Sequence, residues 1–296
     1  GAAPGGEVGS PGADGVRGPD ADGRGAGARG RNRRGAGTPA GRDIKPKSGL
    51  NFRFTDEDLS TAGSWFQKAT RNVEAVELLR QLEKDGRQAT AEEQRTLARF
   101  IGWGASEIAN GLFSPERTKL TKAFEEYQRL RERIEQEGLK EFSPSDPDYW
   151  TVYPKAGRLG YRQPIPVSVV TPEAFGLKTE DLRWLGLRAR LRASLTDAEW
   201  AAAERTTQYA HYTSAPIVRA MWAAAQRFGF AGGAVLEPGA GNGMFPGLMP
   251  EGMATSSSYT GIEYDPITGG ILKQLQPDEH ILVESYVDTK LPRDFF

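Results

Sequence analysis

The sequence has no cysteine and only two histidines, His211 and His280, and these absences exclude several classes of protein. Without cysteine the chain can form no disulfide framework, no thiolate zinc site and no cysteine nucleophile. Two histidines leave little for a histidine-based metal centre, so we predict no metal site. No apolar run approaches the roughly 20 residues that a membrane span needs, so we predict no membrane partner either.

A starting methionine and a signal-peptide pattern are also missing. A secreted product is therefore not supported, and we expect a cytoplasmic protein. The first residue, Gly1, and the abrupt end at Phe296 suggest a piece of a longer chain. The 296 residues, with a formal net charge of −1, permit one large domain or two ordinary ones, at roughly 100–200 residues per domain.

The segment 1–47 differs in composition from the rest of the chain. It holds 14 of the 36 glycines, and its 9 arginines and lysines exceed its 5 acidic residues. Because it has no apolar periodicity, it cannot bury enough apolar surface to offset the entropy of ordering, and we predict a disordered Gly/Arg-rich tail. Its basic run 29–35 could follow a nucleic-acid backbone, but no aromatic residue is interleaved with it, which favours a solvated linker.

Residues 48–140 predict a helical region. Apolar side chains recur at helical spacing over 72–84, and Thr90 with Glu93 gives a capping-box pattern that opens a second helix through Ile101. A third, strongly charged helix is predicted over 118–136. We expect the three helices to form one small packing unit, and the mixture of charge signs favours a solvated face over a helix that reads nucleic acid.

Residues 141–195 are rich in Pro, Asp, Tyr and Gly in their first part, and they predict an irregular connection or insertion with one short strand at 167–170. From 196 to 296 the pattern changes to alternating strands and helices, which is typical of a parallel α/β unit. The predicted elements are helices beginning near Thr196 and Ser214, strands at 234–237, 259–263 and 281–283, and a helix at 267–275. In the helix after Ser214, the apolar residues Ile217, Met221, Ala224 and Phe228 lie on one face.

The most informative stretch is the first of these strands with the loop that follows it, Pro238-Gly239-Ala240-Gly241-Asn242-Gly243. Glycines let the backbone approach a ligand closely and expose N–H groups to it. In an open parallel sheet, ligands bind beyond the carboxyl ends of the strands. The second strand ends on Glu263, 26 residues after Glu237, and an acid there can accept both hydroxyls of a ribose. The pattern therefore favours a nucleoside ligand over a glycine-rich turn without one.

Two cofactor classes share this geometry. Dinucleotide enzymes use G-x-G-x-x-G, which rests a diphosphate on a helix N-terminus, but the third position here is Met244. Glu237, at the start of the loop, would repel a diphosphate and would suit the ammonium of a methionine moiety. We therefore predict S-adenosylmethionine as the cofactor and keep a nicotinamide dehydrogenase as the alternative, which competition by NAD would revive.

Two passages resemble the first two cofactor-binding motifs of N6-adenine DNA methyltransferases: Ala210-His211-Tyr212-Thr213-Ser214 and the stretch 236–243. More narrowly, the chain resembles the large methyltransferase–helicase fusion proteins of phages, plasmids and mobile elements. That resemblance is carried by 83–90 with Phe100-Ile101-Gly102-Trp103-Gly104, by 210–222, by Leu291-Pro292 and, most specifically, by Gly261-Ile262-Glu263-Tyr264-Asp265-Pro266-Ile267-Thr268-Gly269-Gly270-Ile271-Leu272-Lys273-Gln274-Leu275. It covers about 72–110 and 196–296, and 113–195 has no counterpart.

The resemblance implies that 196–296 is the first half of a class I S-adenosylmethionine-dependent methyltransferase sheet, which is Rossmann-like. In the intact protein, S-adenosylmethionine would donate a methyl group to adenine N6 in DNA. The resemblance also implies a role for each matching residue, with Pro238 and Gly243 completing the loop. Tyr212 and Thr213 would line the methionine carboxylate, Glu237 would take the ammonium directly or through water, Gly239, Ala240 and Gly241 would pass under the cofactor, Glu263 would hold the ribose and Tyr264 would pack on the adenine.

The chain also departs from this family. A carboxylate usually follows the third strand; here Ser285 stands at that position, and Glu284 or Asp288 could substitute. The Asn/Asp-Pro-Pro-Tyr/Phe motif that holds a flipped adenine is missing, as is the G-x-x-x-x-G-K-[ST] motif of a helicase motor. We therefore expect this chain alone to be inactive, and its partners to be DNA and the rest of the same polypeptide.

Two further functions stay open. One is a methyltransferase of the same fold that acts on RNA or on a protein glutamine, and the other is a non-catalytic DNA-binding or anti-restriction component of a mobile element. We predict a packing role for His211 and a surface position for His280. The tryptophans at 65, 103, 184, 200 and 222 are expected in the core or at domain contacts rather than as base-stacking platforms, with Trp103 the one to test on DNA.

Overall fold

The computed structural model describes residues 47–60, 62–158, 160, 163–208, 212–291 and 296. The chain divides into two units, Gly1–Gly41 and Arg42–Phe296, and every described residue lies in the second. Apart from Lys47, the predicted tail lies outside the described residues, and so does His211.

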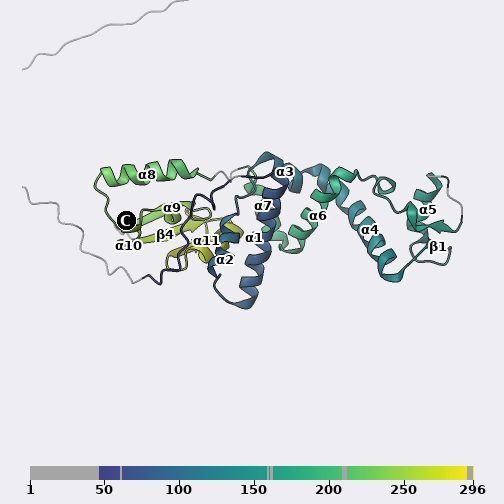
Figure 1. Cartoon of the computed structure of the whole chain (residues 1–296), viewed down its shortest axis with the longest axis horizontal. Helices are drawn as coiled ribbons and strands as arrows, with labels where there is room; N and C mark the ends of the chain where they lie inside the picture. Colours follow the sequence, from purple (N-terminus) through teal and green to yellow (C-terminus); the bar gives the residue numbers. More distant parts are fainter. Residues whose placement is uncertain (1–46, 61, 159, 161–162, 209–211, 292–295) are drawn as a thin grey trace, which may run out of the picture. The chain divides into compact units, whose positions relative to one another are not determined.

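Helices dominate this unit and a small parallel sheet lies near its C-terminal end (Figure 1). No helix in the described ranges has the length and apolar character to cross a membrane. The strands are β1 Glu141–Phe142, β2 Ile165–Pro166, β3 Gly233–Pro238, β4 Ser257–Glu263 and β5 His280–Val283. The helices are α1 Trp65–Asp85, α2 Ala91–Ala98, α3 Ser106–Phe113, α4 Pro115–Glu137, α5 Tyr149–Arg158, α6 Thr179–Ala193, α7 Asp197–Thr206, α8 Ala215–Arg227, α9 Met244–Leu248, α10 Glu251–Thr255 and α11 Pro266–Leu275.

Side-chain caps set several helix starts. Thr90 and Thr196 each form a reciprocal capping box with the glutamate three residues later, which confirms both sequence predictions. Ser64 forms a third capping box with Gln67 at the start of α1, seven residues before the helix start predicted from the apolar spacing. The sequence analysis missed the residues 65–71, of which Ala69 is buried and Phe66 packs against the main core.

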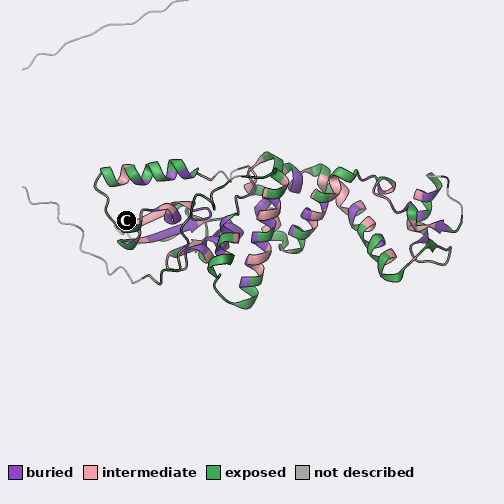
Figure 2. Cartoon of the chain, in the orientation of Figure 1, coloured by how far each residue is buried: buried purple, intermediate pink, exposed green. Residues whose placement is uncertain are grey.

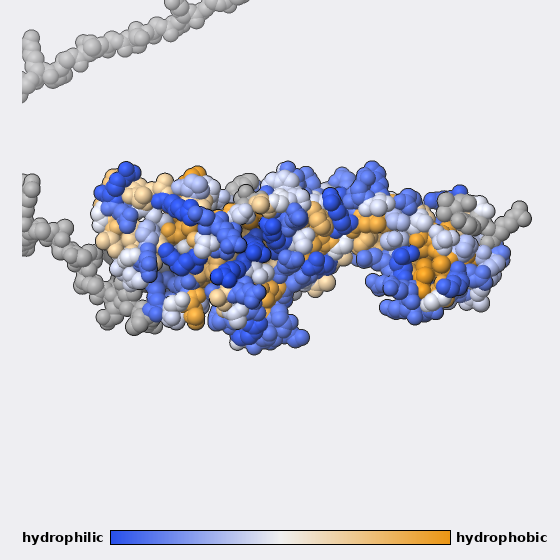
Figure 3. Space-filling model, viewed as in Figure 1, coloured by the Kyte–Doolittle hydropathy of each residue, from blue (hydrophilic) through white to orange (hydrophobic). Residues whose placement is uncertain are grey.

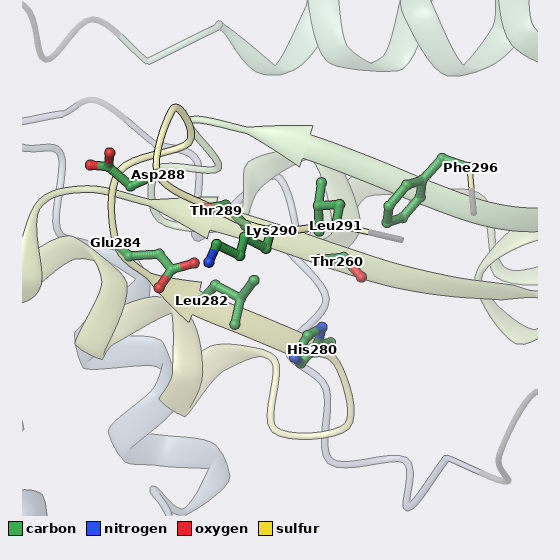
Figure 4. A pocket seen from close by; sticks show the side chains of 9 residues that line it. All are labelled: Thr260, His280, Leu282, Glu284, Asp288, Thr289, Lys290, Leu291 and Phe296. Carbon is green, nitrogen blue, oxygen red and sulfur yellow. The ribbon is translucent and has the colours of Figure 1, made fainter. Parts of the chain in front are cut away.

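The strands β3, β4 and β5 form a parallel sheet in that order, which confirms the mixed α/β class and the three strands predicted over 196–296. The two faces of the sheet are covered differently. On one face Tyr259 packs against Leu272 of α11. On the other, Thr260 and Leu282 line a cavity of about 450 Å³ together with Leu291 of the C-terminal segment (Figure 4).

The largest hydrophobic core joins the helices of the N-terminal half to this sheet. It contains Leu79 and Leu82 of α1, Leu97 of α2, and Ile267 and Ile271 of α11, together with buried residues of α3, α6 and α7. Helix α11 therefore packs on the sheet with one face and on α1 and α2 with the other. Residues of the predicted α/β unit (196–296) and of the predicted helical region (48–140) therefore belong to one hydrophobic core.

A second core is separate and corrects two expectations. Phe124 and Leu130 of α4 pack with Phe142, Val152 and residues around β2, so α4 does not form one packing unit with α1 and α2. The segment 141–195 is also not irregular throughout, because it contains α5 and α6. A 3-10 turn occupies Val167–Val169, where we predicted a strand, and the short β2 precedes it because proline breaks up a longer ladder.

Helix α8 leaves much of its surface uncovered (Figure 2). Val218 and Trp222 pack into a small core with Met249 and Met253. The apolar residues Ile217, Met221 and Phe228 are exposed, and hydrophobic residues reach the surface along α8 in Figure 3.

Candidate functional site

The glycine loop turns sharply at the carboxyl end of β3. Gly239 and Gly241 both have positive φ angles, 79° and 56°, which residues with a side chain rarely adopt. The N–H groups of Gly239 and Ala240 donate to the Ile262 carbonyl of β4, at 2.7 and 2.9 Å. These bonds hold the loop across the ends of two neighbouring strands.

Glu263 joins the same loop to the turn after β4. One of its carboxylate oxygens accepts from the Gly241 N–H at 2.8 Å, and the other accepts from the Asp265 N–H at 2.9 Å. Burial raises the pKa of Glu263, although those N–H groups lower it. A carboxylate has about four lone-pair sites, so each oxygen keeps capacity for a further donor such as a ribose hydroxyl.

Tyr212 lies between two glycines that come from different halves of the chain. A Cβ added at Gly102 would lie 3.1 Å from the Tyr212 hydroxyl, and one added at Gly241 would lie 3.1 Å from its ring. The Tyr212 hydroxyl lies 3.4 Å from Thr268 Oγ1. The segment 100–104 and the glycine loop therefore pack against the same aromatic ring. Either glycine would have to move if it were replaced by a residue with a side chain.

A cavity of about 680 Å³ lies over these carboxyl ends. Its floor is formed by Gly239, Gly241, Glu263 and Val283, and Tyr264, which is 67% exposed, stands at its edge. The opposite wall comes from α7 and from the segment 100–104, and it includes Gly102, Trp103, Ala198, Ala202, Arg205 and Thr206. Sequence analysis missed the α7 wall, because its residues carry no motif and reach the cavity only through the packing of α7 on α11.

The ten predicted cofactor-binding residues do not all meet in this cavity. Tyr212, Gly239, Gly241, Glu263 and Tyr264 line it. Thr213 lines a neighbouring cavity. The other four, which line neither of the two, are Glu237, Pro238, Ala240 and Gly243.

Glu237 lies below the loop and pairs with the next strand. The Tyr259 hydroxyl of β4 donates to its carboxylate at 2.5 Å. Burial raises the pKa of Glu237 to about 7, although the bond from Tyr259 lowers it. Glu237 is not among the residues that line the cavity.

The residues considered after the third strand are also separated. Val283 lines the cavity over the strand ends, whereas Glu284 and Asp288 line the cavity on the opposite face of the sheet (Figure 4). His280 is exposed, as predicted. Trp103 is only 1% exposed and packs edge-on against Phe100, so it offers no surface to DNA, contrary to its selection from the sequence.

Glu263 supplies a charged acceptor, and the glycine loop supplies a floor without side chains. At Gly239 a Cβ would meet no atom within 4 Å, so the loop leaves open space there. Comparison of the chain with protein-family models, with curated proteins and with solved structures gave no match.

Proposed function

We propose that this chain binds S-adenosylmethionine in the cavity over β3, β4 and β5, as the cofactor-binding part of an adenine-N6 DNA methyltransferase fused to a helicase. The proposal treats β3, β4 and β5 as the first three strands of a class I methyltransferase sheet. Their order matches the first half of a doubly wound sheet, in which nucleotides bind beyond the carboxyl ends of the strands.

The observation that carries the proposal is the position of Glu263. Its carboxylate is partly buried at the end of the second strand, is fixed by two backbone N–H groups and lines the cavity beside the glycine loop. In the proposed complex it accepts the ribose hydroxyls, Tyr264 packs on the adenine, and Tyr212 with Gly239 and Gly241 borders the methionine end.

Two features of the site fit S-adenosylmethionine. Trp103 is one of the residues that line the cavity, and its Nε1 atom is a buried donor with no hydrogen-bond partner in the described part of the chain. The floor at Gly239 is open. When bound, the cofactor would supply an electrophilic methyl group, and the protein's residues would hold and orient it.

A dinucleotide fits less well. Its diphosphate needs a helix N-terminus behind the glycine loop, but α9 has only five residues and begins at Met244. The same argument does not separate DNA from RNA or protein as the methyl acceptor, so those acceptors remain alternatives to be compared in methyl-transfer assays.

Isothermal titration of the chain with S-adenosylmethionine, and separately with NAD, tests the proposal. Binding is the suitable readout because the sequence contains no Asn/Asp-Pro-Pro-aromatic motif. We expect S-adenosylmethionine to bind and NAD not to bind. Glu263→Ala removes the charged acceptor and should weaken binding by a factor of 10 or more, whereas Glu284→Ala, on the opposite face of the sheet, should not change it.

Because Glu263 also holds the glycine loop, Tyr264→Ala serves as a second variant. Tyr264 is largely exposed, so this change should leave the thermal midpoint unaltered and still weaken S-adenosylmethionine binding about fivefold or more. Absence of binding by the unaltered chain, or equal binding by all variants, would reject the proposal.

A further inference from the structure

A second cavity, of about 630 Å³, adjoins the cofactor cavity. It lies between the start of α1, the end of α2 and the start of α8, and Tyr212 lines both cavities. Its position matters because it shares the lining residue Tyr212 with the cavity proposed for the methyl donor. Nothing in the cofactor proposal uses its residues except Tyr212 and Thr213.

Positive charge exceeds negative charge in the lining of this cavity. Four cationic side chains line it, Lys68, Arg71, Arg99 and Arg219, against two acidic ones, Asp56 and Asp58. Both acids are already engaged. Asp56 pairs with Arg219 at 2.7 Å, and Asp58 accepts from the Thr55 N–H and hydroxyl, at 2.9 and 2.7 Å.

The other three cations have no acidic partner. Over the described ranges, Lys68, Arg71 and Arg99 form no ion pair. Helix α8, of 13 residues, also begins at this cavity, and Ser214 provides no side-chain cap for its free N–H groups. The partial positive charge of a helix start adds to that of the side chains.

An aromatic ring stands among these charges. Trp65, the first residue of α1, lines the cavity and is 39% exposed. The Lys68 ammonium lies 4.1 Å from the centre of the Trp65 ring. Cations that can neutralise phosphates, combined with an exposed ring on which a base can stack, are the features of single-stranded nucleic-acid sites.

We propose that this second cavity binds a single-stranded or unpaired stretch of nucleic acid, with its phosphates on Lys68, Arg71 and Arg99 and one base stacked on Trp65. This inference rests on the proposed function for the role of the bound strand. The strand lies beside a methyl donor only if the first cavity binds S-adenosylmethionine. An acidic peptide would satisfy the cations but would leave the Trp65 ring without a stacking partner.

Fluorescence anisotropy with a labelled 12-nucleotide single-stranded DNA and the full chain tests this inference. The double variant Lys68→Gln/Arg99→Gln should weaken binding tenfold or more. It should also reduce the slope of log K against log salt by about 1.4, because each phosphate contact contributes about 0.7 on a single strand. The matched control, Lys119→Gln/Arg131→Gln, removes two exposed cations of α4 and should change neither quantity.

The contact with the Trp65 ring is tested with one variant and one control variant. Trp65→Ala should weaken binding about fivefold or more, whereas Trp150→Ala should not, although Trp150 is 70% exposed. Unchanged DNA binding in the cavity variants would overturn the inference, because it would place the nucleic acid elsewhere, for instance on the basic run 29–35. Competition by polyglutamate as effective as that by unlabelled DNA would overturn it too.

Titration of the same variants with S-adenosylmethionine separates the two proposals. If the unaltered chain binds DNA through these residues but does not bind S-adenosylmethionine, the proposed function fails and the nucleic-acid site stands. If S-adenosylmethionine binds and the cavity variants leave DNA binding intact, the proposed function stands and the nucleic-acid site fails.

Discussion

Glu237 and Glu263 end neighbouring strands, yet their surroundings give them different roles. Burial raises the pKa of both carboxyl groups. Glu263 is held by backbone N–H groups and faces the cavity, whereas Glu237 is held by the Tyr259 hydroxyl beneath the loop. The proposed function therefore gives ligand contact to Glu263, and we expect a pH-dependent contribution to stability from Glu237.

The first prediction concerns the pH dependence of folding. The pKa of Glu237 is about 7 in the folded chain, against an ordinary value of 4.5. The folded state therefore holds this proton more tightly. The stabilisation from Glu237 is fully present below about pH 4.5, falls as the pH rises, and is lost above about pH 7.

Glu237→Gln removes this dependence while keeping an acceptor for Tyr259. Relative to the unaltered chain, its free energy of unfolding should rise by about 1–3 kcal/mol between pH 5 and pH 8. Urea unfolding at the two pH values measures this difference, and the exposed Glu132→Gln serves as the control. An equal difference at both pH values would show that Glu237 does not titrate between them.

For individual residues, the sequence predicted the part of the cavity lining that comes from the glycine loop and the end of β4. Glycines after a strand and an acid at the end of the next strand are local patterns, so Gly239, Gly241 and Glu263 could be found without coordinates. The bond from Tyr259 to Glu237 and the wall residues Ala198, Ala202 and Arg205 could not be found, because they depend on strand register and on where α7 packs.

At the scale of elements, α8 shows how an apolar pattern can give the wrong face. The sequence places Ile217, Met221 and Phe228 on one side of the helix, and this side is exposed. The packed side carries Val218 and Trp222. Periodicity predicted the helix and its start correctly, but it does not determine which of two apolar stripes meets the core.

The second prediction separates these faces of α8. Val218 is fully buried, so Val218→Ala should lower the free energy of unfolding by about 2 kcal/mol. Met221 is 52% exposed, so Met221→Gln should change it by less than about 0.5 kcal/mol. Urea titrations of the two variants give both values. A larger loss from Met221→Gln would show that the exposed face is covered in solution.

At the scale of the whole unit, two cores divide the described residues. The first joins α1, α2 and α3 to α11, and one of its residues, Trp103, lines the cavity over the strand ends. The second belongs to α4, α5 and their neighbours. The sequence could not show this division, because contacts between α1 and α11 join residues almost 200 positions apart and leave no local pattern.

The third prediction follows from that division. Leu79→Ala, in the first core, should lower the free energy of unfolding by about 2–5 kcal/mol and should speed hydrogen exchange in α11 as well as in α1. Leu130→Ala, in the second core, should have a comparable cost but should speed exchange in α4 and α5 without affecting α11. Both side chains are almost fully buried, so they form a matched pair. Hydrogen exchange followed by mass spectrometry distinguishes the patterns, and faster exchange in α11 from both variants would contradict the two-core description.

The measurement that tests the central claim most directly is a crystal structure of the chain grown with saturating S-adenosylhomocysteine, the stable product of methyl transfer. The account predicts the ligand over Gly239 and Gly241, with its ribose hydroxyls on Glu263 and its adenine against Tyr264. An empty cavity at saturating ligand, or the ligand bound elsewhere with Glu263 uncontacted, would contradict the account.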